Sequence, residues 1–301
     1  MLLSNTIEGL LTNGMSHKEA IKFMADMGYD AYDMMFDAMQ YKPEDPWNQD
    51  NYREYAKELR EYADELGIVC NQAHAPMNSK CGDEEFDVTF MPLVIRSMEI
   101  AAILGAKIIV VHPVQCLPYA ENAELLKEMN MKFYNSLIPY CEQFGIKVAA
   151  ENMWQWNRFT RQCIHSTCSR AEEFCDYIDS INNEWIVACL DIGHVVLVSE
   201  DIPRMIKMLG NRLAALHIHD NDYKDDMHAF PFFHQIRFDQ MTKALSEIGY
   251  KGDFTFEIGG IYRKLPRETW ESATKLLVDS GRYLMKQIGR ASCRERVSVR
   301  V

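Results

Sequence analysis

The sequence predicts a single-domain α/β protein in which eight strand–helix units close into a (β/α)8 barrel. Apolar, β-branched segments alternate with amphipathic segments of helical period from residue 2 to residue 285. No linker, repeat or shift in composition interrupts this alternation. The 301 residues are 48% hydrophobic, which is enough to bury a large core.

The predicted strands are short apolar runs bounded by turn residues. Their ranges are 2–5, 31–36, 68–74, 107–114, 147–153, 185–194, 213–219 and 253–258. The run at 108–111 is IIVV, as expected for a strand that is covered on both faces. A doubly wound open sheet is the main alternative, but the chain has no GxGxxG motif after its first strand and no P-loop.

The predicted helices follow the strands and carry apolar residues on one side. Their ranges are 16–27, 50–66, 93–104, 122–144, 169–178, 202–209, 239–248 and 267–285. Ser16 is suited to cap the first of them, because its hydroxyl can accept a backbone N–H there. The helix at 202–209 is predicted to be short.

Charge and cysteine content narrow the class of function. The net charge of −12 argues against a surface that binds nucleic acid, which needs clustered Lys and Arg. No run of 18 apolar residues and no signal peptide is visible, and the nine cysteines form no CxxC pair, so we expect a cytoplasmic protein with reduced thiols.

The last residues look foreign to the fold. The segment 288–297, IGRASCRERV, resembles translated sequencing adapter, so we expect one domain over 1–287 and a non-native or disordered tail over 288–301. Removing that tail takes away four arginines and one glutamate and leaves a net charge of −15.

Six polar residues recur at the ends of predicted strands three to eight. They are His74, His112, Glu151, Asp191, His217 and Glu257, separated by 38, 39, 40, 26 and 40 residues. Because a parallel barrel directs the carboxyl ends of its strands to one place, we expect these side chains to converge.

Four of these residues form the predicted metal site. Glu151, Asp191, His217 and Glu257 offer three carboxylates and one imidazole, which suit one divalent ion such as Mn²⁺, Mg²⁺, Co²⁺ or Zn²⁺. Two carboxylates across a substrate can remove and return a proton α to a carbonyl, while a metal stabilises the enediolate.

A second ring of residues is predicted around this centre. His74, His112, His194 and His228 are expected to bind substrate oxygens, and Trp154 to wall the pocket. Asp33 and Asp37 lie in and just after the second strand. A substrate-facing role and a solvated capping role are equally consistent with the sequence for both residues.

Several motifs together resemble a known family. AAENMW at 149–154, LDIGH at 190–194, LHIHDND at 216–222, DMHAFPFFHQIRF at 226–238 and FEIGG at 256–260 resemble the xylose isomerase-like TIM barrels, and more closely their sugar phosphate isomerase/epimerase branch. The chain has His234 and Arg237 where a glycine and an acidic residue are common.

The resemblance implies a metal-dependent enzyme. It assigns Glu151, Asp191, His217 and Glu257 to one divalent metal, Glu151 and Glu257 to acid/base catalysis, and His194 to a substrate oxygen. It also implies a small carbohydrate substrate, and neither nucleic acid nor a membrane as a partner. A homo-oligomer is compatible with this prediction.

Three other functions remain open at this point. An inosose dehydratase-like lyase would use the same metal to eliminate water. A trinuclear zinc phosphoesterase similar to endonuclease IV would use nine ligands, and all nine residue types are present: His74, His112, Glu151, Asp191, His194, His217, Asp226, His228 and Glu257. A metal-binding scaffold without turnover would not need both Glu151 and Glu257.

Overall fold

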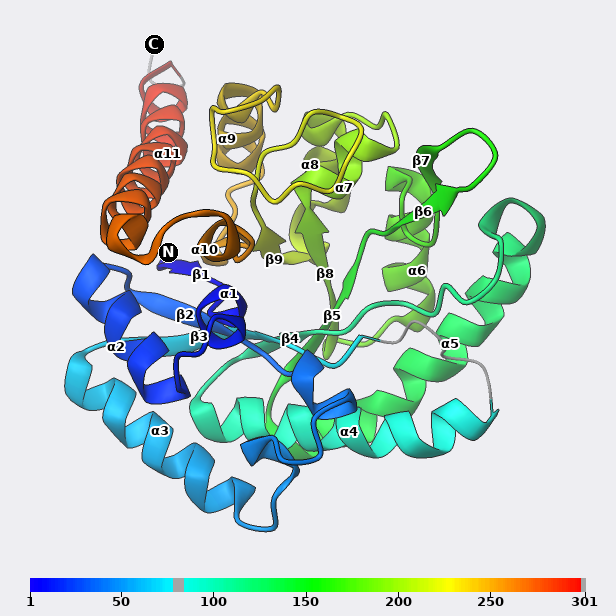
Figure 1. The fold of residues 1–301 in the computed structure, drawn as a ribbon. Coiled ribbons are helices and arrows are strands. Elements are labelled where there is room, and N and C mark those ends of the chain that lie inside the picture. Colours follow the sequence, from blue (N-terminus) through cyan, green and yellow to red (C-terminus); the bar gives the residue numbers. More distant parts are fainter. Residues whose placement is uncertain (78–83, 299–301) are drawn as a thin grey trace.

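Eight parallel strands in the described part of the chain close into a barrel with helices outside it (Figure 1). The structure is a computed structural model, which describes residues 1–77 and 84–298 and the side chains of all of these except 84–87 and 290–298. The barrel strands are β1 (Leu3–Asn5), β2 (Ala31–Met35), β3 (Val69–His74), β4 (Ile108–Val110), β5 (Lys147–Glu151), β8 (Ile186–Asp191), β9 (Leu213–His217) and β10 (Phe254–Phe256). The predicted (β/α)8 barrel is confirmed.

Two short contacts close the barrel into a ring. Six strands pair in the order β2-β3-β4-β5-β8-β9, and β1 pairs with β10. Isolated parallel bridges join the two groups, one between Thr6 and Asp33 and one between Ile218 and Phe256. The carboxyl ends of all eight strands therefore face the same rim.

The helices lie outside the strands, and most begin and end close to the predicted residues. They are α1 (Glu8–Thr12), α2 (His17–Met27), α3 (Tyr52–Leu66), α4 (Glu84–Leu104), α5 (Tyr119–Phe144), α6 (Ala171–Ile181), α7 (Ile192–Leu197), α8 (Ile202–Leu209), α9 (Phe238–Glu247), α10 (Ile261–Lys264) and α11 (Trp270–Ser298). Ser16 caps α2 as predicted, and it forms a reciprocal capping box with Glu19. No helix in this part of the chain is both long and apolar enough to cross a membrane.

The structure differs from the predicted boundaries after β5 and β8. The predicted strand at 147–153 ends at Glu151, and an antiparallel hairpin of β6 (Trp154–Asn157) and β7 (Gln162–His165) follows at the rim. The predicted strand at 185–194 ends at Asp191, because the Asp191 side chain accepts the His194 N–H and caps α7. His194 therefore lies on a helix and not in a strand.

Small apolar side chains from β4, β5, β8 and β9 fill one side of the barrel interior. Val110, Ala149, Cys189 and Ala215 form a small buried cluster. Each lies two residues before a strand-end ligand candidate, so alternation along the strand points both residues inward. This cluster forms a layer beneath the strand-end groups, while the main core packs between strands and helices.

The last helix is longer than predicted. Helix α11 continues past the predicted end at 285, and Ile288 is buried. The side chains beyond 289 and residues 299–301 lie outside the described residues, so a foreign tail over 288–301 stays a prediction. The seven cysteines within the described residues form no disulfide.

Candidate metal centre

The six strand-end residues converge at one rim of the barrel, as predicted. They come from β3, β5, β8 and β9 and from the residues just after β4 and β10. Four of the six side chains are at most 1% exposed, and those of His112 and Glu257 are each 12% exposed. Few proteins bury so many ionisable groups without a compensating charge, because each carries a desolvation cost.

Glu151, Asp191, His217 and Glu257 form the central set. One ligand atom from each lies within 4.8 Å of those of the others. His217 Nδ1 lies 2.8 Å from Glu151 Oε1 and 3.4 Å from Glu257 Oε2. Glu151 Oε2 lies 3.0 Å from His112 Nε2 and is buried. Three carboxylates and one imidazole in one buried cluster are a donor set that fits a divalent cation.

Asp33 is a member of this centre to which the sequence analysis gave no role. It is 1% exposed, and its Oδ2 lies 3.7 Å from His217 Nε2. The Gln72 amide donates to the same Asp33 oxygen at 3.3 Å. A proton on His217 Nε2 would face Asp33, which leaves the Nδ1 lone pair toward Glu151 and Glu257.

His74 and His112 form a second ligand set with Glu151. His74 Nδ1–H donates to the Ala75 carbonyl at 2.7 Å, so a neutral His74 directs its Nε2 lone pair inward. That Nε2 atom lies 3.0 Å from His112 Nε2, which lies 3.0 Å from Glu151 Oε2. The structure thus places both residues in contact with Glu151 at the rim of the barrel.

His194, His228 and Asp226 form a third set at the same rim. His194 Nδ1–H donates to the Asn152 carbonyl at 2.8 Å, and His228 Nδ1–H donates to the Glu257 carbonyl at 2.6 Å. Their Nε2 atoms lie 3.3 Å and 3.2 Å from the same Asp226 oxygen. Both imidazoles therefore present Nε2 to one carboxylate, which is the arrangement of a metal-ligand pair.

His219 and Gly193 pack tightly between the central and third sets. His219 Nε2 lies 3.1 Å from both Asp191 oxygens, and its ring stacks on His228 at 4.1 Å. A β-carbon on Gly193 would lie 1.9 Å from the His219 ring, so only glycine fits there. The G in the motif LDIGH is the sequence signal for this close approach.

Two polar clamps hold the rim in place. Asn152 and Asp191 exchange a pair of 2.9 Å hydrogen bonds that join the ends of β5 and β8. Asp220 is fully buried, and its carboxylate accepts the backbone N–H groups of Asn221, His234 and Ile236 at 2.8 to 3.0 Å. This second clamp fixes the loop that carries Asp226 and His228. A lone Asn or Asp in a loop gives no sequence signal for such a role.

Burial and neighbouring charges shift the pKa values of the two glutamates in opposite directions. Burial raises the pKa of Glu257 above its ordinary value. Burial acts the same way on Glu151, but the surrounding His217, His112 and His74 imidazoles lower the pKa of Glu151 well below its ordinary range. The two carboxyl groups next to His217 Nδ1 therefore prefer different protonation states.

Trp154 lies beside the third set. It is the first residue of β6, and its ring meets that of His194 edge-on at 6.4 Å. Trp156 is 46% exposed and Phe233 is 66% exposed. Trp154 is therefore placed to wall the rim, whereas the other two face outward.

Comparison with known proteins identifies the family of the chain. A family model described as xylose isomerase-like TIM barrel matches residues 21–279. The uncharacterized protein y4fM of Sinorhizobium fredii is 27% identical over 168 residues, which are 55% of this chain and 51% of that protein. This chain therefore spans about half the length of that relative. The uncharacterized protein MJ1311 of Methanocaldococcus jannaschii is 26% identical over 238 residues, which are 78% and 76% of the two chains.

Solved structures of the same fold include several sugar epimerases. A D-tagatose 3-epimerase-like protein superposes with a TM-score of 0.73 at 20% identity and covers 99% of this chain and 100% of its own. A D-psicose 3-epimerase gives 0.71 at 15% identity, covering 94% and 99%. The 3-keto-D-glucoside 4-epimerase of E. coli gives 0.71 at 15% identity, covering 95% and 99%. These likenesses show the shared fold.

Proposed function

The chain belongs to the xylose isomerase-like TIM-barrel family, and from that premise we propose that it is a divalent-metal-dependent isomerase or epimerase of a small carbohydrate. The observation that carries the proposal is the position of Glu151 and Glu257, whose oxygens lie 2.8 Å and 3.4 Å from one nitrogen of His217 at the barrel rim. The names of three structural neighbours support a ketose or related hydroxyketone as the substrate class: a D-tagatose 3-epimerase-like protein, a D-psicose 3-epimerase and a 3-keto-D-glucoside 4-epimerase.

The proposed reaction is proton transfer at carbon. One glutamate removes the proton next to the substrate carbonyl, which gives an enediolate, and the other returns a proton to the opposite face or to the neighbouring carbon. Glu151, Asp191, His217 and Glu257 would hold the metal. When bound, a divalent ion supplies positive charge that stabilises negative charge developing on substrate oxygens.

The surrounding residues would bind and orient the substrate. His74, His112, His194 and His228 offer ring nitrogens at the rim, and Trp154 shields one side from water. Which of these four imidazoles contact sugar hydroxyls and which contact metal depends on how many ions the chain binds. A cytoplasmic location and a homo-oligomeric state stay predictions.

Deuterium exchange tests the proposal. In D2O, we expect the metal-loaded protein to exchange the proton next to the carbonyl of D-fructose, D-psicose, D-tagatose or a phosphate of these sugars. The loss of this proton signal is measured by NMR. Glu151→Gln and Glu257→Gln should each lower the exchange rate by about 100-fold or more, because each removes an acid/base group. Glu142→Gln changes an exposed residue of α5 and serves as the matched control. Wild-type exchange by either active-centre variant would exclude that residue as an acid/base group.

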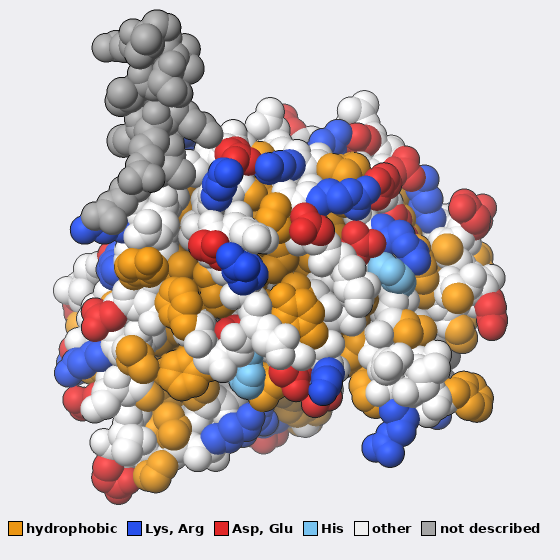
Figure 2. Space-filling model, turned by 90° about the horizontal axis from the view of Figure 1, so that it is seen from above, with side chains coloured by type: hydrophobic (Ala, Val, Ile, Leu, Met, Phe, Trp, Pro, Cys, Tyr) orange, Lys and Arg blue, Asp and Glu red, His pale blue; other side chains and the backbone are white. Residues whose placement is uncertain are grey.

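A second candidate function is supported by the two further ligand sets. His74, His112 and Glu151 form one. In the other, Asp226 lies within 3.7 Å of ring nitrogens of His194, His219 and His228, so three ions could bind side by side. Such a cluster suits hydrolysis of a phosphoester. Against a DNA substrate stands the net charge of −12, and on the face in Figure 2 lysine and arginine side chains are interspersed with acidic ones. Cleavage of abasic DNA by the metal-loaded protein would favour this candidate, and its absence would exclude that substrate.

A further inference from the structure

A cysteine thiol lies next to the proposed metal centre. Cys189 is fully buried in β8, and the pairing of β5 with β8 sets it opposite Glu151. Its sulfur lies within 4.8 Å of one ligand atom of Glu151 and one of His217, and those two atoms lie within the same distance of each other. Cys189 therefore shares two neighbours with the central set of Glu151, Asp191, His217 and Glu257.

The strand geometry explains why this sulfur reaches the centre. Side chains two residues apart on a strand point to the same face, so Cys189 and Asp191 of β8 both point into the barrel. Cys189 belongs to the small buried layer beneath the strand-end groups, whose other members are Val110, Ala149 and Ala215. Those three side chains are hydrocarbon, so within this layer only Cys189 offers a donor atom to a metal.

A sulfur ligand changes which ions a site prefers. Carboxylates and imidazoles accept Mg²⁺, Mn²⁺, Co²⁺ and Zn²⁺, whereas a thiolate binds Zn²⁺ and Co²⁺ and disfavours Mg²⁺. A Zn–S bond of about 2.3 Å and a Zn–N bond of about 2.1 Å together reach ligand atoms about 4.4 Å apart across one ion. The 4.8 Å limit on the separations at Cys189 is close to this reach.

The thiol can take part only if an ion displaces its proton. Burial raises the pKa of the Cys189 thiol well above its ordinary value, so the side chain is neutral before an ion binds. On binding, the S–H bond breaks, a sulfur–metal bond forms, and the proton leaves to solvent. The charge of the ion offsets the cost of the buried thiolate.

We propose that Cys189 is a thiolate ligand to the ion held by Glu151 and His217, and that it makes this centre select Zn²⁺ or Co²⁺ over Mg²⁺. The inference rests on the metal centre of the proposed function and deepens it by naming the class of ion. It assigns Cys189 no part in proton transfer.

Binding of Co²⁺ to the metal-free full chain tests the proposal. We expect a sulfur-to-cobalt charge-transfer band in the near ultraviolet, which Cys189→Ala and the similarly sized Cys189→Ser should both lose. Cys189→Ala should also bind Zn²⁺ at least about tenfold more weakly, while its affinity for Mg²⁺ stays within about threefold of wild type. Competition with a chelator measures both affinities.

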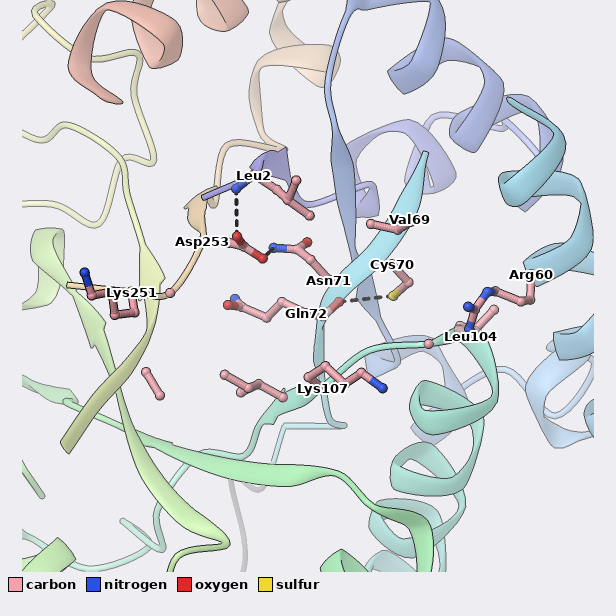
Figure 3. A pocket seen from close by; sticks show the side chains of 14 residues that line it. Leu2, Arg60, Val69, Cys70, Asn71, Gln72, Leu104, Lys107, Lys251 and Asp253 are labelled. Carbon is pink, nitrogen blue, oxygen red and sulfur yellow. Dashed lines mark hydrogen bonds between the residues drawn. The ribbon is translucent and has the colours of Figure 1, made fainter. Parts of the chain in front are cut away.

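Cys70→Ala is the matched control. Cys70 is a second buried strand thiol, and it lies in the lining of a cavity at the amino ends of the strands (Figure 3). Its thiol donates to the Gln72 carbonyl at 3.3 Å. We therefore expect Cys70→Ala to keep the charge-transfer band and the wild-type affinity for Zn²⁺.

The outcomes separate this inference from the proposed function. Co²⁺ bound without the band, or a band that persists in Cys189→Ala, would overturn the role of Cys189 and leave the metal centre standing. An unchanged ratio of Zn²⁺ to Mg²⁺ affinity in Cys189→Ala would also overturn it. A wild-type chain that binds no Co²⁺ at all would contradict the metal centre and the proposed function together.

Discussion

Asp33 lies beside Nε2 of His217, whereas Nδ1 of the same ring lies next to Glu151 and Glu257. It accepts from Gln72 at 3.3 Å and lies 3.7 Å from His217 Nε2. Asp33→Asn removes the charge that favours a proton on this nitrogen, so we expect metal affinity to fall about 10- to 100-fold with the fold unchanged. Metal affinity measured by competition with a chelator checks this. Asp37→Asn is the matched control, since Asp37 contacts Gln40 and Met77 instead. Equal affinities in wild type and Asp33→Asn would contradict the role of Asp33.

Gly193 is the position where the centre leaves no room for a side chain. Gly193→Ala would place a β-carbon 1.9 Å from the His219 ring, which stacks on His228 and has nowhere to move. We expect a loss of about 1–3 kcal/mol in the free energy of unfolding, measured in urea. Gly260→Ala, where no atom lies within 4 Å of the added carbon, should change stability little. Equal stabilities of the two variants would show that the rim can rearrange around His219.

Single residues show where prediction from sequence stops. The six strand-end residues were predictable because each ends an apolar run and the barrel topology brings those ends together. Asp33 was not, because a lone carboxylate inside a strand has no local pattern that separates a buried partner of histidine from a cap. His219 was quoted in a motif, but only the structure shows that its ring reaches Asp191 at 3.1 Å.

The element boundaries show a second limit of the sequence. The segment after Asp191, IGHVVL, is apolar except for His194 and reads as a continuation of the strand, yet the Asp191 cap turns it into α7. The β6–β7 hairpin was missed because its strands, WQWN and QCIH, carry too many polar residues to read as a buried strand. Long periodic helices such as α3 were predictable within about two residues.

The first turn of α6 (Ala171–Ile181) contains a carboxyl that titrates near neutrality. Burial raises the pKa of Glu173 from 4.5 to about 7, and its Oε2 has no hydrogen-bond partner among the described residues. The folded state holds this proton more tightly than the unfolded state. The contribution of Glu173 to stability is therefore fully present at low pH and is lost as the pH rises through about 7.

Glu173→Gln should remove this pH dependence. We expect the variant to exceed wild type in the free energy of unfolding by about 1–3 kcal/mol near pH 8 and to match it near pH 4. Urea unfolding at the two pH values measures both, with the exposed Glu142→Gln as control. A constant difference between variant and wild type at both pH values would contradict a raised pKa at Glu173.

The two ends of the barrel carry different polar groups. At the carboxyl ends of the strands lie carboxylates and imidazoles in three sets that share Glu151 or adjoin one another. At the amino ends lies a cavity whose lining includes Arg60, Lys107 and Lys251. Gln72 also lines this cavity and donates to Asp33 beside His217, so a polar contact joins the two ends. The predicted barrel with one convergent rim is confirmed by the family match and the closed ring of strands.

The metal content of the purified protein tests the central claim most directly. Elemental analysis should find at least one divalent ion per chain, and this ion should be lost in Asp191→Ala and in His217→Ala. It should be kept in the control His165→Ala, because His165 ends β7 and its ring lies 3.0 Å from the Ser169 hydroxyl. A value near one supports the isomerase or epimerase, and a value near three supports the phosphoesterase. A chain that binds no divalent ion, or keeps its ion in both active-centre variants, would contradict a metal centre at Glu151, Asp191, His217 and Glu257.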